Sequence, residues 1–154
     1  MAVSSYEPVS SYELDREVFQ LLKLGTEQGK KQFDTWQGAA SGIGDYVASW
    51  GVERFWAMSR SQALLGGRIP DAAAESENER RYFAWGVARV VLCKIVGNDL
   101  RIRQDMTTDE FQNQFRELDF NQQVLLTDLL IEISSAIQFW TMRLKDALDS
   151  NTPA

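Results

Sequence analysis

The amino-acid sequence predicts an all-α protein, a single-domain bundle of five to six helices. Apolar residues recur at steps of three and four over several long stretches, the spacing that places side chains on one face of a helix. The three prolines lie near the ends or at breaks between these stretches, where a missing amide costs little. At 154 residues the chain has the length of one domain with one core. We expect a flexible leader over 1–9, the bundle over 10–148 and a polar tail over 149–154.

The first half of the bundle is predicted as three helices. Residues 10–25 begin with a capping box, in which a serine and a glutamate three positions later each accept from a first-turn amide. A shorter helix follows near 33–36, and the small residues of 38–42 indicate a tight helix crossing or a bend. From 45 to 65 the apolar spacing predicts a second strong helix, ended by two glycines and a proline.

The central helix is predicted over 77–97, with the glycine and asparagine at 97 and 98 as its left-handed stop. Ser76 and Glu79 form a second capping box at its start. One face of this helix is expected in the core, because the following residues fall at helical spacing: Ala84, Val87, Ala88, Val91, Leu92 and Ile95.

Two further helices complete the prediction. Thr107 and Glu110 form a third capping box, which starts a short helix over 107–118. The longest helix covers 120–148 and can span the whole domain. Its middle, 133–142, carries no charge, so more than one of its faces is expected to be covered by this domain or by a partner.

Composition removes several classes of function. Histidine is absent and Cys93 is the single cysteine, which excludes disulfides, Cys/His zinc sites and His-based triads within the chain. Cys93 is interpreted as a small buried apolar residue. Carboxylates near 75–79 are interpreted as helix-capping acids, and the pair Asp128 and Glu132 lacks a matching second pair. We therefore expect no enzyme, no metal and no cofactor.

The first residues of the sequence have neither a basic region nor an apolar run, so we expect no signal peptide there. No stretch approaches about 18 uninterrupted apolar residues, the length of a membrane span. We expect a soluble protein in the cytoplasm.

Basic residues are concentrated in one region. The net charge is −6, but 54–103 holds nine basic and five acidic residues, and the rest of the chain carries −10. Arg81, Trp85 and Arg89 lie four apart, which places two guanidinium groups beside an indole on one helix edge. Two alternating arginines after the central helix are either phosphate contacts or part of an ordinary surface loop. The segregation indicates an anion-facing surface or solvated helix faces.

The central helix RRYFAWGVARVVLCKIVG and the C-terminal pair MTTDEFQNQFRELDFNQQVLLTDLLIEISSAIQFWTMRLKDAL resemble the small helical subunit of a CRISPR RNA-guided effector complex, of type I-D or type III. The resemblance lies in size, helical organisation, missing catalytic groups and a basic face. It implies several copies packed along other subunits that hold a guide RNA, with contacts to guide RNA or target DNA. The positions that would contact the nucleic-acid backbone are Arg80, Arg81, Arg89, Lys94, Arg101 and Arg103, then Arg54 and Arg60, with Trp85 and Trp56 as stacking candidates.

Two hypotheses of function follow. The first is a non-enzymatic small subunit of such a nucleic-acid surveillance complex. The alternative is a helical adaptor or regulatory protein that docks a protein partner through the uncharged face of 133–142. Trp56 is interpreted either as a stacking platform or as a core residue. A metal enzyme built on carboxylates is a third and weaker reading of the sequence.

Overall fold

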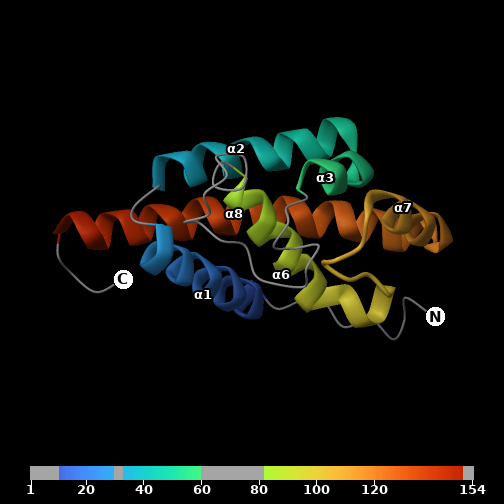
Figure 1. Ribbon diagram of the computed structural model, residues 1–154, viewed down its shortest axis with the longest axis horizontal. Helices are drawn as coiled ribbons and strands as arrows, with labels where there is room; N and C mark the ends of the chain where they lie inside the picture. The colour runs from blue at the N-terminus through green and yellow to red at the C-terminus, as the bar shows by residue number, and fades with distance from the viewer. Residues whose placement is uncertain (1–10, 30–32, 60–81, 151–154) are drawn as a thin grey trace.

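The computed structural model of the chain describes residues 11–29, 33–59 and 82–150. These residues form six helices and no strand (Figure 1): α1 (Ser11–Gly29), α2 (Phe33–Trp50), α3 (Val52–Met58), α6 (Phe83–Leu100), α7 (Thr108–Glu117) and α8 (Phe120–Ser150). The predicted all-α class is therefore confirmed. Several predicted features lie outside the described residues: the leader 1–9, the capping residue Ser10, the Ser76–Glu79 box, the helix end at 66–70, and Arg60, Arg80 and Arg81.

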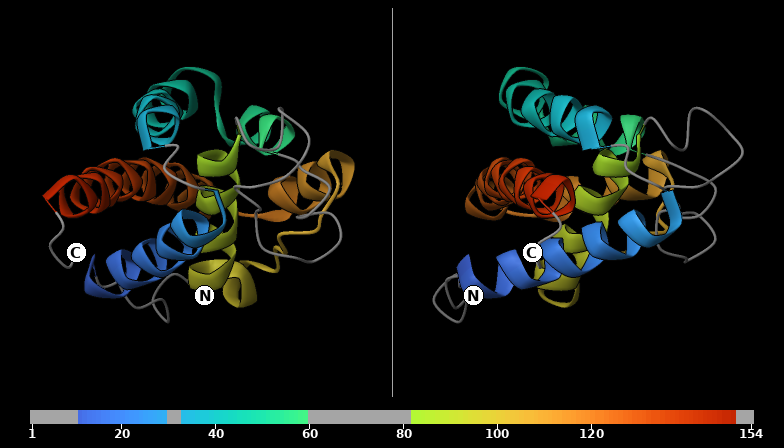
Figure 2. Two further views of the ribbon diagram at one scale, coloured as in Figure 1. Left: turned by 60° about the vertical axis from the view of Figure 1, so that its left-hand side comes forward. Right: turned by 90° about the vertical axis from the view of Figure 1, so that its left-hand side faces the viewer.

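The long helix α8 is the axis of the bundle. It packs against α2 on one side and α1 on the other, while α6 crosses it (Figures 1 and 2). Its predicted inward residues are confirmed as buried at Leu126, Leu129, Leu130, Ile133, Ile137 and Leu144. The buried Ser134 hydroxyl accepts from the Gly44 amide at 3.2 Å and donates to the Ala40 carbonyl, which fixes α8 against the antiparallel α2.

Residues Phe120–Ala147 of α8 are long and apolar enough to cross a membrane, with a mean hydropathy of 1.3 over the best window. A core helix of a soluble protein has the same property. In this fold α8 packs part of its apolar surface against α1, α2 and α6, while Phe120, Ile131 and Phe139 are among its exposed apolar residues.

The central helix α6 is buried on nearly every side. From Phe83 to Leu92 every side chain is buried, rather than the one face that the sequence predicted. The helix also passes the predicted stop at Gly97 and ends at Leu100. Arg101 takes the left-handed conformation, with φ 58°, and the Gly97 carbonyl accepts from the amides of Arg101 and Ile102. A Cβ at Gly97 would lie 2.8 Å from the Ile102 carbonyl oxygen, so this glycine permits the loop to return across the helix.

The predicted helix over 45–65 is wrong, because the chain breaks at Gly51. This residue has φ 91°, which an L-residue adopts only with strain, and it separates α2 from the short α3. Upstream, the sequence left a tight helix crossing or a bend open for 38–42; there is no bend, since α2 runs through without a break, whereas α8 crosses closely there, with Ser134 bonded to the backbone of Ala40 and Gly44. Likewise α1 continues past Gly25 to Gly29.

Capping fixes the two C-terminal helices. The predicted Thr107–Glu110 box is confirmed, with the Glu110 amide 3.2 Å from Thr107 Oγ1 and the Thr107 amide 2.9 Å from Glu110 Oε1. A reciprocal pair that the sequence analysis missed precedes α8. The Gln122 amide donates to Asp119 Oδ1 at 2.8 Å, and the Asp119 amide donates to Gln122 Oε1 at 3.0 Å. The turn between α7 and α8 is therefore closely defined.

Candidate interaction site

Arg89, predicted on an exposed anion-facing edge, is fully buried. Its guanidinium donates to four oxygens: Gln104 O at 2.9 Å from Nε, Trp56 O at 3.0 Å and Ser59 Oγ at 3.4 Å from Nη1, and Met106 O at 2.6 Å from Nη2. Burial lowers the pKa of Arg89 to about 10. Its expected contact with nucleic acid is therefore wrong, because carbonyl groups inside the protein occupy the donors.

The two tryptophans named as stacking candidates are also buried, which corrects the prediction for Trp85 and, of the two interpretations of Trp56, leaves the core residue. The Trp56 indole N–H donates to Met106 O at 3.0 Å. The Arg89 guanidinium lies over the same indole, 3.9 Å from the ring centre. Trp85 stacks on Phe55 at 5.7 Å and meets Tyr46 edge-on at 5.4 Å. Both rings belong to the core, so neither presents a face to a ligand.

The remaining described basic candidates are exposed but lie on separate elements. Lys94 on α6 forms an ion pair with Glu17 at 3.2 Å, and Arg54 on α3 lies 4.4 Å from the Trp50 ring centre. Arg101 and Arg103 lie on the loop after α6, where Leu100 and Ile102 anchor it in the core.

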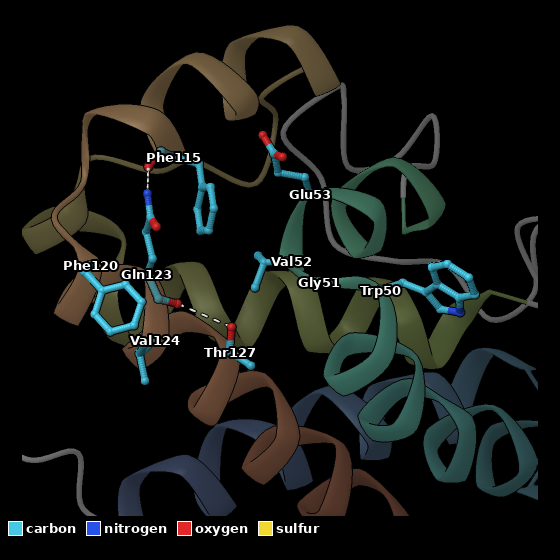
Figure 3. A pocket seen from close by; sticks show the side chains of 9 residues that line it. All are labelled: Trp50, Gly51, Val52, Glu53, Phe115, Phe120, Gln123, Val124 and Thr127. Carbon is cyan, nitrogen blue, oxygen red and sulfur yellow. Dashed lines mark hydrogen bonds between the residues drawn. The ribbon is translucent and has the colours of Figure 1, made fainter.

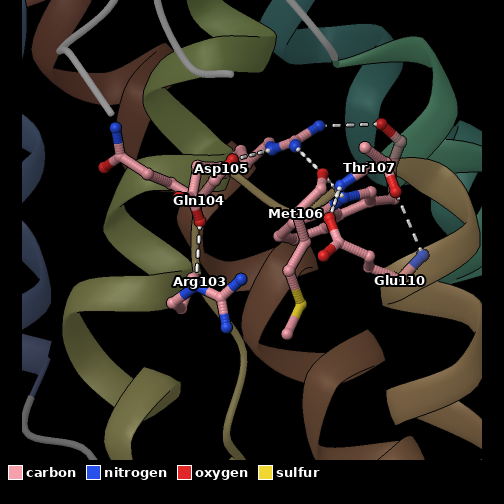
Figure 4. A network of polar contacts seen from close by, with 8 residues as sticks. Arg103, Gln104, Asp105, Met106, Thr107 and Glu110 are labelled. Atoms are coloured by element: carbon pink, nitrogen blue, oxygen red, sulfur yellow. Dashed lines mark hydrogen bonds and ion pairs between the residues drawn. The ribbon is translucent and has the colours of Figure 1, made fainter. Parts of the chain in front are cut away.

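Within that loop the Arg103 Nε donates to Asp105 Oδ1 at 3.0 Å. Figure 4 shows this segment together with the reciprocal hydrogen bonds of Thr107 and Glu110 that follow it. Three of these four basic groups therefore already have a partner within the chain.

A stack of aromatic rings leads from Arg89 toward the surface. Trp56 stacks on Phe111 with ring centres 4.1 Å apart and an angle of 9°, and Phe111 stacks on Phe115 at 5.7 Å. We call Arg89, Trp56, Phe111 and Phe115 the aromatic ladder. Because Arg89 also binds the loop that precedes α7, it positions this helix and the ring of Phe115 at its end.

The ladder ends at an apolar groove of about 270 Å³, the Trp50 groove (Figure 3). Its walls come from the ends of α2 and α7 and the starts of α3 and α8, and its lining is Trp50, Gly51, Val52, Glu53, Phe115, Phe120, Gln123, Val124 and Thr127. Three of these apolar side chains are strongly exposed: Phe120 at 76%, Trp50 at 56% and Val124 at 40%.

The polar side chains that line the Trp50 groove differ in whether they have hydrogen-bond partners within the chain. The Gln123 amide nitrogen donates to Phe115 O at 2.9 Å and Leu118 O at 3.3 Å, and the Thr127 hydroxyl donates to Gln123 O at 3.3 Å. The Glu53 Oε1 is buried, and within the described part of the chain nothing donates a hydrogen bond to it. Glu53 is therefore the one polar lining side chain left without a described partner.

The uncharged face of 133–142, predicted as a docking surface, is mostly core. Ile133, Ser134, Ala136, Ile137 and Thr141 are buried, which accounts for the missing charges. Phe139 is exposed at 53% and lines a second groove of about 390 Å³ with Leu14, Asp15, Glu132, Ser135 and Ala136. Trp140 meets the Phe139 ring edge-on at 5.0 Å.

The described residues contain no group of three His, Cys, Asp or Glu side chains that could hold a metal ion. Cys93 is half-buried, and burial raises the pKa of its thiol to about 12. Comparison of the chain with protein-family models, with curated proteins and with solved structures gives no significant match.

The Trp50 groove has no pattern of its own in the sequence. The helix predicted over 45–65 includes position 50, so Trp50 counts there as part of one continuous helix. Gly51, a glycine inside that predicted helix, was the available signal of a break.

Proposed function

We propose that this chain is a non-enzymatic, cytoplasmic helical subunit that docks a protein partner through the Trp50 groove. The observation that carries the proposal is that Phe120, Trp50 and Val124, all exposed, line one groove formed by four helix ends. Single exposed apolar residues are ordinary on protein surfaces, whereas a contiguous group around a concave site is typical of interaction surfaces.

The groove has the features of a preformed docking site. Aromatic side chains dominate binding energy at protein interfaces, and they act most strongly in pockets that exclude water. The Gln123 and Thr127 hydrogen bonds and the aromatic ladder hold the walls in place before binding, so a partner would lose little free energy in ordering them.

The raised pKa of Cys93 supports a non-enzymatic role. The thiolate is the nucleophilic form of cysteine, and a thiol with a pKa near 12 is almost wholly protonated at neutral pH. The single cysteine of the chain is thus a poor candidate nucleophile.

A second candidate function is a subunit of an RNA-guided surveillance complex, in which copies of this chain pack along other subunits. The observation that favours it is the exposed pair Arg101 and Arg103 on the loop anchored by Ile102. Arginine side chains bind phosphate oxygens well, and their contribution weakens steeply with salt. In this proposal the Trp50 groove would contact a neighbouring subunit.

Co-purification of the tagged full chain from its native cells tests both candidates. We expect a protein partner that is retained after nuclease treatment and lost from the Val124→Asp variant. The matched control is Asn121→Asp, which adds the same charge to the same exposed turn of α8 without lining the groove.

Short RNAs of uniform length that are lost from an Arg101→Glu, Arg103→Glu double variant would instead support the second candidate. Recovery of the chain alone would contradict both.

A further inference from the structure

We infer that the Trp50 groove recognises a basic amphipathic helix, which inserts apolar side chains and places a lysine or arginine against Glu53. This inference rests on the proposed docking function and adds the chemistry of the partner.

The Glu53 carboxylate calls for a cation from outside. Glu53 is partly exposed at the groove, so a cation from outside can approach its carboxylate, and charge-assisted bonds to lysine or arginine are the strongest that a carboxylate makes. Glu53 stands at the rim of the groove, above Val52 and opposite Phe115 (Figure 3). A cation bound there would lie next to the apolar side chains that fill the groove.

The charged neighbours within the described chain do not supply this cation. Arg54 follows Glu53 on α3, but its guanidinium lies over the Trp50 ring. Among the described residues, every ion pair joins other side chains. On α7, the charges of Arg116 and Glu117 offset each other at the C-terminal end, and the acidic residues of its first turn supply no cation either. With a net charge of −6, the whole chain also favours a basic partner over an acidic one.

The shape of the groove favours a helix as the occupant. Its walls are helix ends whose nearby carbonyls already accept from Gln123, and the described residues include no sheet edge to which a strand could be added. Recognition therefore relies on inserted side chains, as when an amphipathic helix docks into a groove. A groove of about 270 Å³ takes a few side chains, and the methylene stem of lysine or arginine can lie along the apolar wall.

The probe we would use is a phage-displayed library of 16-residue helical peptides with random residues on one face, selected on the full chain and counterselected on Val124→Asp. We expect enrichment of a lysine or arginine within one turn of bulky apolar residues. Glu53→Gln should weaken the selected peptides about tenfold or more, as loss of a hydrogen bond to a charged group does. Glu53→Lys should prefer peptides whose cation is replaced by glutamate.

The same contact can be tested without changing the protein. Replacing the peptide lysine or arginine with glutamine should weaken binding to the wild-type chain by a similar factor. High salt should reduce the affinity of the parent peptide more than that of the glutamine peptide.

The two levels of the inference fail differently. If no peptide is selected, or if all selected peptides bind Val124→Asp as well as wild type, the docking function itself is overturned. If peptides bind through the groove but carry no enriched cation, or ignore both Glu53→Gln and their own glutamine substitution, only the role of Glu53 is overturned.

Discussion

Arg89 is a buried residue that joins separate parts of the bundle through its hydrogen bonds. The i, i+4 relation to Trp85 was read correctly as one helix edge, but α6 is surrounded by other elements, so that edge faces the interior. The planar guanidinium has five donors and can serve several carbonyl groups at once. Here it joins α3, α6 and the loop before α7, a role that requires tertiary contacts and has no local signal in the sequence.

Replacing Arg89 with methionine should destabilise the fold by about 3 kcal/mol, because buried carbonyls lose charge-assisted donors that methionine cannot replace. Arg89→Lys should cost less, since the ammonium keeps the charge but cannot reach the same set of oxygens. The free energy of unfolding in urea, followed by circular dichroism, measures both. Arg101→Met is the control, because Arg101 is exposed, and we expect a change within about 0.5 kcal/mol. Equal effects at the two positions would contradict a structural role for Arg89.

At the scale of the element, periodicity and capping predicted helices better than glycine predicted their ends. The box at Thr107 and the apolar stripe of α8 are local patterns, and both are confirmed. Gly97 was read as a stop because glycine is common after helices. The structure uses it for close approach of Ile102, and the left-handed residue is Arg101. Conversely, Gly51 ends α2 within a stripe that looks continuous.

Two glycines inside helices allow a matched test of packing against propensity. Gly42 in α2 faces open space, so Gly42→Ala should stabilise the protein by about 0.5–1 kcal/mol through helix propensity. A Cβ at Gly25 in α1 would lie 2.3 Å from the buried Phe83 ring, so Gly25→Ala should destabilise by about 1–3 kcal/mol through overpacking. Thermal unfolding should give shifts of opposite sign. A rise in melting temperature for both variants would show that α1 and α6 are not packed as described.

For the whole molecule, periodicity predicted the fold class and much of the core, but not the Trp50 groove. Trp50 and Phe120 are 70 positions apart, and they line the same groove because α2 and α8 run antiparallel and because the turns at Gly51 and Asp119 bring four helix ends together. Pairing between distant helix ends depends on the packing of the whole bundle. A single sequence carries no local pattern for it.

The alkaline stability of the whole molecule should depend on Cys93. Its pKa is raised from 9.0 to about 12, so the folded state keeps a proton that the unfolded state releases, and this contribution to stability is lost as pH rises from about 9 to 12. Arg89 has the opposite sign. Its pKa is lowered from 12.5 to about 10, so the unfolded state holds the extra proton and stability rises with pH between about 10 and 12.5.

The interval from pH 9 to 10 is therefore where the thiol contribution falls while Arg89 has only begun to lose its proton. Urea unfolding of the wild type and Cys93→Ala across this interval should show the wild type losing stability relative to the variant. Ionisable groups outside this pair are common to both proteins and cancel in the difference, whereas the charge of Cys93 acts on Arg89, so the variant also lowers the pKa of Arg89. Cys93→Ala removes a half-buried side chain, so its stability below pH 9 sets the baseline from which the difference is measured. If the difference in the free energy of unfolding stays constant from pH 8 to 10, the thiol has the same pKa in the folded and unfolded chains. That result would contradict a pKa raised by burial within the bundle.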